Sequence, residues 1–149
     1  MNNIVISTTT ANIMEDNNKT KIDIHQKLKK KLDYFIENHK IPHIIFYGNS
    51  GTGKKYVLNY FIKKIYNNDQ MKIKEYVMYV NCAHCKGIRF IRDELKFFAK
   101  RNMQNNNGKI FKSIILLNAE KLTTDAQSAL RRCIEQFSVY TRFFIIIEN

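Results

Sequence analysis

Tryptophan is absent from the 149-residue chain, proline occurs once, and there are only five glycines and three cysteines. Few cysteines, odd in number, together with no secretory signal pattern at the N-terminus, predict a reducing compartment and no disulfide framework. No apolar run is long enough to span a bilayer. These absences exclude a small disulfide-stabilised secreted domain and argue against a membrane protein.

The composition is that of a globular domain, with 44% hydrophobic and 26% charged residues. Its length suits one domain with a sizeable core. The net charge is +12, and 14 of the 25 basic residues but only 4 of the 13 acidic ones lie in residues 54–112. Such a region can bind nucleic-acid phosphates by releasing counterions. The alternative is a compositional bias, because the chain is rich in Lys, Asn and Ile together.

Hydrophobic periodicity divides the chain into a tail, residues 1–20, and a domain, residues 21–149. The tail is Thr/Asn-rich and predicted to be flexible, with a possible short strand at Ile4-Val5-Ile6. An amphipathic helix is expected from Ile22 to His39, before Pro42. Three further helices are expected. The first follows a glycine-rich segment described below, the second covers residues 88–98, and the third follows a capping box of Thr124 and Gln127. Apolar strands are predicted at residues 44–47, 76–80, 113–117 and 143–147. Strands that alternate with helices predict a parallel sheet with helices on both faces.

A glycine-rich segment joins the first of these apolar strands to a helical pattern. It consists of Gly48, Asn49, Ser50, Gly51, Thr52, Gly53, Lys54 and Lys55. The spacing Gly-x4-Gly-Lys is typical of the phosphate-binding P-loop, in which backbone N–H groups and a helix N-terminus hold phosphate oxygens. Lys54 is expected to reach the β- and γ-phosphates, whereas Lys55 replaces the Ser or Thr that offers a hydroxyl to Mg²⁺.

Three stretches resemble one family, the small subunits of replication factor C, which are clamp-loader AAA+ ATPases. PHIIFYG at 42–48 resembles the run into the family's P-loop, and residues 81–92 keep Asn81, Gly87, Ile88 and Arg92 of its next motif. The stretch Leu122–Arg132 is nearly identical to the family's LTxDAQxALRR signature. The resemblance covers about residues 22–149. It implies an α/β P-loop NTPase (AAA+) domain.

The resemblance also implies a function: binding ATP and taking part in sliding-clamp loading during DNA replication. The implied partners are other clamp-loader subunits, a sliding clamp and primer–template DNA, inside the cell at sites of replication. Asn149 falls near the family's sensor-1 asparagine. Arg131 and Arg132 become candidates for DNA or subunit contact; the alternative is a solvated pair in which Arg131 bonds Glu135.

Departures from the family pattern lead us to expect weak or absent hydrolysis and weakly held Mg²⁺. Lys55 offers no lone pair to a metal, and Leu117 and Asn118 occupy the Walker B positions where the family has two acids. Glu120 falls too far along the turn to be assumed a substitute. The resemblance ends after the sensor-1 strand, so the lid and collar domains are expected to be absent. The P-loop strand then becomes a sheet edge, which Ile4 to Thr8 or a partner chain is expected to cover.

Three other interpretations were weighed. A scaffold or DNA-binding module that kept the fold without using nucleotide remains the main alternative, because the Walker B acids are missing. A small P-loop kinase is disfavoured by the LTxDAQxALRR match. Zinc binding by the cluster of Cys82, His84 and Cys85 is disfavoured because it offers at most three ligands within four residues, so no metal site is predicted there.

Overall fold

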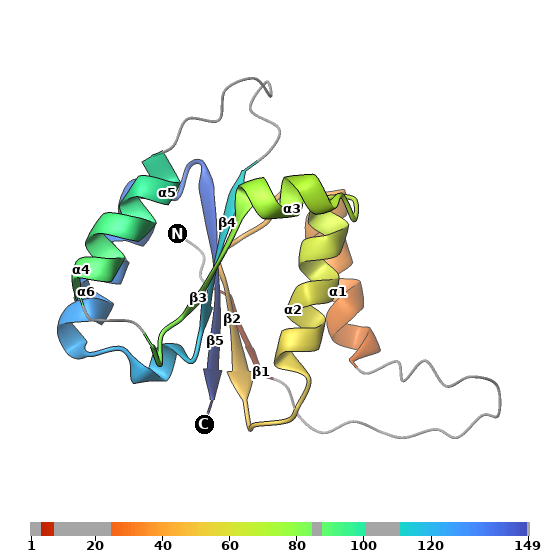
Figure 1. The fold of residues 1–149 in the computed structure, drawn as a ribbon. Coiled ribbons are helices and arrows are strands. Elements are labelled where there is room, and N and C mark those ends of the chain that lie inside the picture. Colours follow the sequence, from red (N-terminus) through yellow and green to blue (C-terminus); the bar gives the residue numbers. More distant parts are fainter. Residues whose placement is uncertain (1–3, 8–24, 85–87, 101–110, 149) are drawn as a thin grey trace.

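The computed structural model describes residues 4–7, 25–84, 88–100 and 111–148, which form a five-stranded sheet between two layers of helices (Figure 1). The strands are β1 (Ile4–Ser7), β2 (Ile44–Gly48), β3 (Val77–Asn81), β4 (Lys112–Leu117) and β5 (Thr141–Glu148). All neighbouring strands are parallel, in the order β1-β2-β5-β4-β3. The predicted α/β class with a parallel sheet is confirmed.

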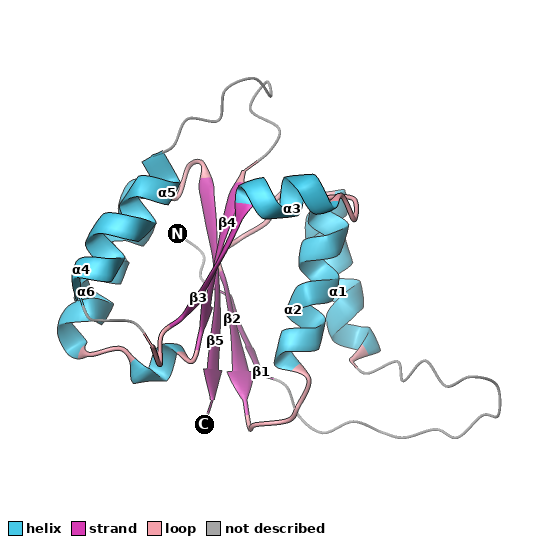
Figure 2. Cartoon of the chain, viewed as in Figure 1, coloured by secondary structure: helices cyan, strands magenta, loops and turns pink. Residues whose placement is uncertain are grey.

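Each face of the sheet carries its own helices (Figure 2). One layer consists of α1 (Gln26–Glu37), α2 (Lys54–Ile65) and α3 (Gln70–Tyr76). The other consists of α4 (Ile88–Phe90), the π-helical turn η1 (Ile91–Leu95), α5 (Lys96–Lys100) and α6 (Thr124–Phe137). A 3₁₀ turn, η2 (Ala119–Lys121), links β4 to α6. Within the described residues, no helix is long and apolar enough to cross a membrane.

Strand β1 covers the edge of the P-loop strand. Its four residues pair in parallel with β2, from Ile4 opposite Ile44 to Ser7 opposite Tyr47. The expectation that the N-terminal segment covers this edge is therefore confirmed over Ile4–Ser7, while Thr8 lies outside the described residues. This part of the predicted tail, residues 1–20, belongs to the sheet.

Two apolar clusters fill the space between the sheet and its helical layers. Phe61 of α2 and Phe144 of β5 are both fully buried in the first cluster, with ring centroids 5.6 Å apart in an edge-to-face arrangement. The second cluster lies under α6 and η1, where Leu95, Ile114 and Cys133 are buried. Because both faces of the central strands are covered, β4 is buried over its first five residues, as expected for a parallel sheet.

Two local predictions were wrong. Tyr76 was predicted to start a strand, but it ends α3, a helix that the periodicity did not indicate; Asp69 begins this helix by accepting hydrogen bonds from two N–H groups, those of Met71 and Lys72. The cap of α6 is Thr123 and not Thr124, because the Thr123 hydroxyl accepts the Ala126 N–H at 3.3 Å. Two adjacent threonines made the choice ambiguous in the sequence.

His43 lies just before β2 and links it to β5. Its Nδ1 accepts a hydrogen bond from the Phe143 N–H at 3.1 Å. Nδ1 can accept this bond only when it carries no proton, as in the neutral imidazole. Burial, and secondarily the nearby Arg142, lowers the pKa of His43 from 6.5 to about 4. Neutral His43 therefore belongs to the folded state at physiological pH.

A pH dependence of stability follows from His43. Between pH 6.5 and about 4 the His43 ring is protonated in the unfolded chain but neutral in the folded chain. The free energy of unfolding therefore falls as the pH falls through that range. We expect His43→Asn, which keeps an acceptor but cannot titrate, to reduce the slope of unfolding free energy against pH by up to ~1.4 kcal/mol per unit. Urea unfolding at a series of pH values measures this slope, and identical slopes for the two proteins would disprove it.

Candidate functional site

The loop from Gly48 to Lys54 connects β2 to α2 at the carboxyl edge of the sheet (Figure 1). Gly51 and Gly53 have φ values of 78° and 83°, in the left-handed region that residues with a side chain rarely adopt. A Cβ atom at Gly51 would meet nothing within 4 Å, so backbone conformation and not crowding requires glycine there. The loop therefore depends on glycine for its shape.

The N-terminus of α2 is open to an anion. Gly53 is its N-cap and provides no side-chain hydrogen bond, and the first turn contains no acidic residue. The first intrahelical bond runs from the Val57 N–H to the Gly53 carbonyl, which leaves the preceding N–H groups without an acceptor in the helix. A helix end of this kind carries a partial positive charge and suits a phosphate.

Lys54 places a buried ammonium beside the same loop. Its side chain is 4% exposed, and Nζ donates hydrogen bonds to the carbonyls of Gly48 at 2.8 Å and Asn49 at 2.7 Å. The carboxylate of Glu148 lies 3.8 Å from Nζ. The ammonium is thus held at the loop by groups that an incoming phosphate oxygen could replace.

Glu148 is a site residue that the sequence did not reveal. It ends β5 directly opposite Gly48, and this register brings its carboxylate to Lys54. The Glu148 N–H donates to the Glu120 carboxylate at 3.2 Å, so the side chain of a second acidic residue contacts the backbone at this end of the sheet. Asn149, the predicted sensor, lies outside the described residues.

The Walker B positions carry no acid in the structure. Leu117 ends β4, and Asn118 follows with a left-handed backbone, φ 54°. The Asn118 amide donates to the Asn81 side-chain oxygen at 2.9 Å, so the two amides bond each other. Carboxylates and hydroxyls are the ligands that Mg²⁺ prefers, and the exposed Lys55 offers neither. The residues at these family positions therefore do not fit the metal.

His25 adds an unpredicted contact from α1. It immediately precedes that helix with φ 64°, and its Nε2 lies 2.6 Å from the Thr52 carbonyl oxygen. The Thr52 hydroxyl in turn donates to the Asn49 carbonyl at 2.9 Å. The start of α1 and the loop's own side chains therefore fix the P-loop backbone.

The remaining predicted site residues do not join this loop. Arg131 and Arg132 are exposed on α6, in the helical layer opposite α2 (Figure 2), and among the described residues Arg131 forms no ion pair with Glu135. Cys82 is buried and His84 exposed, whereas Cys85 lies outside the described residues. Within the part of the chain that the structure describes, no group of three His, Cys, Asp or Glu side chains could hold a metal ion.

A P-loop between a strand and a helix of a parallel sheet, with helices on both faces, is the arrangement of a P-loop NTPase-type domain. No family model matches the chain. The chain is similar to several curated proteins. It is 36% identical over 121 residues to the replication factor C small subunit of Natronomonas pharaonis, and the alignment covers 81% of this chain and 35% of that protein. It is 37% identical over 119 residues to replication factor C subunit 2 of Saccharomyces cerevisiae, covering 74% and 33%.

A third relative extends the match along the chain. The probable replication factor C subunit 5 of Caenorhabditis elegans is 34% identical over an alignment 152 positions long, gaps included, which covers 94% of this chain and 41% of that protein. The chain therefore contains an AAA+ domain of the replication factor C small-subunit type. It spans between a third and about two fifths of the length of these relatives.

Proposed function

We propose that this chain is an ATP-binding member of a clamp-loader assembly that acts inside the cell at DNA replication, with little or no hydrolysis of its own. One observation carries the proposal: the buried Lys54 ammonium lies beside the uncapped N-terminus of α2, in a loop of P-loop shape. A polyphosphate is the ligand that this combination of a fixed cation and free N–H groups suits best.

ATP would be held by its phosphates. The backbone N–H groups of residues 49–54 would donate hydrogen bonds to the phosphate oxygens. Lys54 would exchange its present acceptors, two backbone carbonyls, for oxygens of the β- and γ-phosphates. His25 and Thr52 would keep the loop in place from the side of α1.

The residues at the Walker B positions, which replace the two acids of the family, support slow hydrolysis of ATP. Neither Leu117 nor Asn118 can hold a metal through water or orient an attacking water as a carboxylate does. The carboxylate of Glu148 lies 3.8 Å from the Lys54 ammonium, where it pairs with the lysine. The ATP-bound state would then persist. Bound ATP would serve to set the conformation of the clamp-loader assembly.

Glu148 should oppose ATP binding, which gives a prediction. Its carboxylate lies 3.8 Å from the Lys54 ammonium and would repel an incoming triphosphate. We expect Glu148→Gln to tighten ATP binding by about tenfold at low salt and by less at high salt, since the carboxylate is partly exposed. Titration of a fluorescent ATP analogue measures the change, with Glu135→Gln on α6 as the control. Weaker binding by the Glu148 variant would show that this acid assists the nucleotide.

Assembly with other clamp-loader subunits, a sliding clamp and primer–template DNA is supported by the relatives, whose names are those of replication factor C subunits. The net charge of +12 and the exposed Arg131 and Arg132 suit contact with DNA phosphates or an acidic neighbour. Co-expression with the clamp-loader subunits of the same organism, followed by size-exclusion chromatography, tests this. We expect co-elution, whereas elution of the chain by itself would count against membership of the assembly.

A second candidate is an ATP-independent scaffold or DNA-binding module. The amide pair of Asn81 and Asn118 favours it, because Asn118, at a Walker B position, is an amide that bonds the side chain of Asn81 and not an acid. The two candidates differ in one property: the scaffold would bind no ATP.

A further inference from the structure

A groove runs along β3 at the far edge of the sheet from β1. One part of it is a hollow of about 590 Å³ between the strand and the helical segment η1–α5. We call these lining residues the β3 groove: Val77, Met78, Asp93, Glu94, Phe97 and Phe98. A second hollow continues it past Tyr79 to Asn81, on the strand side, and past Arg89 and Phe90, on the helix side.

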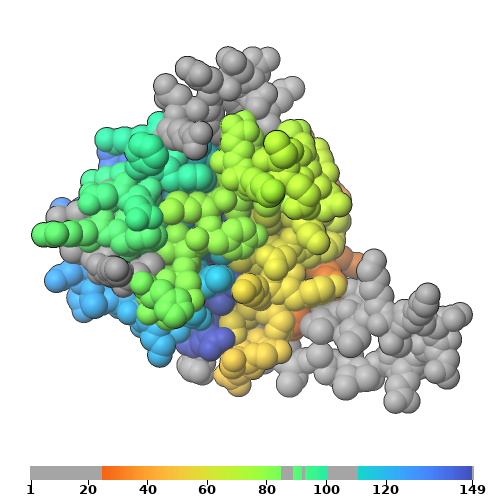
Figure 3. Space-filling view, viewed as in Figure 1, coloured from red at the N-terminus to blue at the C-terminus, as the bar shows by residue number. Residues whose placement is uncertain are grey.

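Strand β3 lies at an edge of the described sheet. Among the described strands it pairs with β4 alone and ends the sheet order. In the space-filling view β3 is visible at the surface between the two helical layers (Figure 3). An edge strand of this kind presents N–H and C=O groups that can pair with a further strand. Five residues, Val77–Asn81, give an edge long enough for a short peptide.

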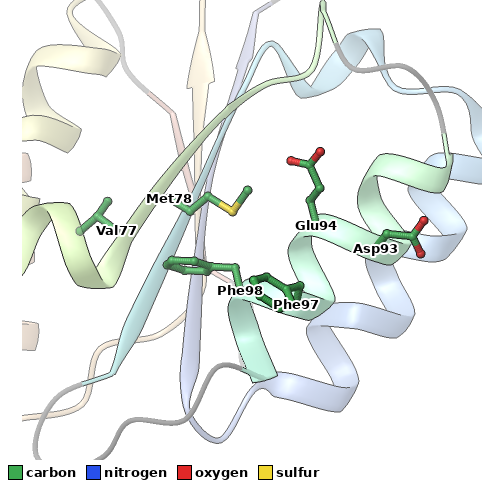
Figure 4. Close-up of a pocket in the computed structure, with 6 residues that line it drawn as sticks. All are labelled: Val77, Met78, Asp93, Glu94, Phe97 and Phe98. Atoms are coloured by element: carbon green, nitrogen blue, oxygen red, sulfur yellow. The ribbon is translucent and has the colours of Figure 1, made fainter.

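Apolar side chains lie next to this edge. Met78 of the strand and Phe98 of the helix face each other across the hollow (Figure 4). Phe97 is 74% exposed although it is a large aromatic residue. Contiguous exposed apolar surface is a feature of protein–protein contact sites.

Glu94 supplies the chemical preference of the β3 groove. Its side chain points into the space beside β3, whereas Asp93 points away from Met78 (Figure 4). No described cation lies within ion-pair distance of Glu94, in a protein whose net charge is +12. A carboxylate beside apolar surface, without an ion-pair partner among the described residues, is complementary to a lysine or arginine of a bound chain.

The helical wall has a local feature that accompanies the groove. Asp93 and Glu94 lie in the π-helical turn η1, and such turns occur often at functional sites. A second copy of this chain is a poor occupant, because a two-fold contact uses the same patch on both subunits and would bring two Glu94 carboxylates into one interface.

We propose that the β3 groove binds an extended segment of a partner protein, which adds a strand to β3. The segment would place a lysine or arginine beside Glu94 and apolar side chains against Met78, Phe97 and Phe98. Main-chain hydrogen bonds would provide affinity and these alternate side-chain contacts would provide specificity. The proposal does not depend on nucleotide binding.

The test uses a fluorescein-labelled ten-residue peptide that alternates valine with threonine and carries two lysines. One matched peptide has glutamates in place of the lysines, and another is N-methylated at alternate residues so that it cannot pair as a strand. Fluorescence anisotropy measures binding to the whole chain, and amide hydrogen exchange follows residues 77–81. We expect saturable binding of the lysine peptide, at least tenfold weaker binding of both matched peptides, and slower exchange along β3.

Variants of the chain separate the contacts. Glu94→Lys should weaken binding at least tenfold, while Glu37→Lys, the same charge change on α1, should not. Phe97→Ala removes an exposed side chain and should weaken binding without altering the melting temperature; Tyr34→Ala, 60% exposed on α1, is its control. Equal effects of the two charge variants, equal binding of the N-methylated peptide, or no binding up to ~1 mM would each overturn the proposal.

Discussion

Replacement of Lys54 by alanine is expected to weaken ATP binding by at least about 100-fold. The ammonium is buried at the loop and would donate charge-assisted hydrogen bonds to two phosphates, each worth about 1.5–3 kcal/mol. Loss of ~3 kcal/mol corresponds to a factor of about 100 in the dissociation constant. Titration of a fluorescent ATP analogue with both proteins measures this ratio.

The neighbouring lysine is the matched control. Lys55→Ala removes the same charge from the same helix turn, but this side chain is exposed and forms no hydrogen bond or ion pair with the described residues. We expect its effect on ATP affinity to stay below about threefold, since exposed charges are screened. Equal losses in the two variants would show that general positive charge, and not the position of Lys54, holds the nucleotide.

Replacement of Phe144 by alanine is expected to lower the unfolding free energy by about 3–5 kcal/mol. Phe144 is fully buried in the central strand β5, and its ring packs edge-to-face on Phe61 of α2, the helix that follows the P-loop. The loss combines the transfer of a large side chain to water with the cavity left behind. Because a domain of this kind has only about 5–15 kcal/mol of stability in total, the variant should also lose ATP binding on mild warming.

Phe97→Ala is the control for that change. The same ring is removed from an exposed position on α5, and we expect a loss within about 0.5 kcal/mol. Chemical unfolding monitored by circular dichroism compares the two variants with the unmodified chain. A small effect at Phe144 would contradict a core that joins β5 to α2.

Much of the fold could be predicted because local signals are strong where both faces of a strand are buried. Continuous apolar runs identified β2, β4 and β5, and the glycine spacing identified the turn into α2. The helix α3 was missed because its seven residues carry no clear apolar stripe. The pairing of β1 could be expected only from the edge it covers, since four residues hold little periodic information.

The site was predictable in its loop and not in its surroundings. The sequence alone indicates that Lys54 follows a glycine loop, but the position of Glu148 depends on the register between β2 and β5, which are separated by about a hundred residues in the chain. The contact of His25 with Thr52 likewise depends on how α1 packs. Neither contact has a spacing signature in the sequence.

The most direct test of the proposed ATP-binding function is calorimetric titration of the unmodified chain with ATP, first in EDTA and then in Mg²⁺. We predict a micromolar dissociation constant, about −8 kcal/mol, that changes little with Mg²⁺, because Lys55 and Asn118 stand where metal-binding groups are needed. The absence of binding up to millimolar ATP in both conditions would contradict the proposal and favour the scaffold.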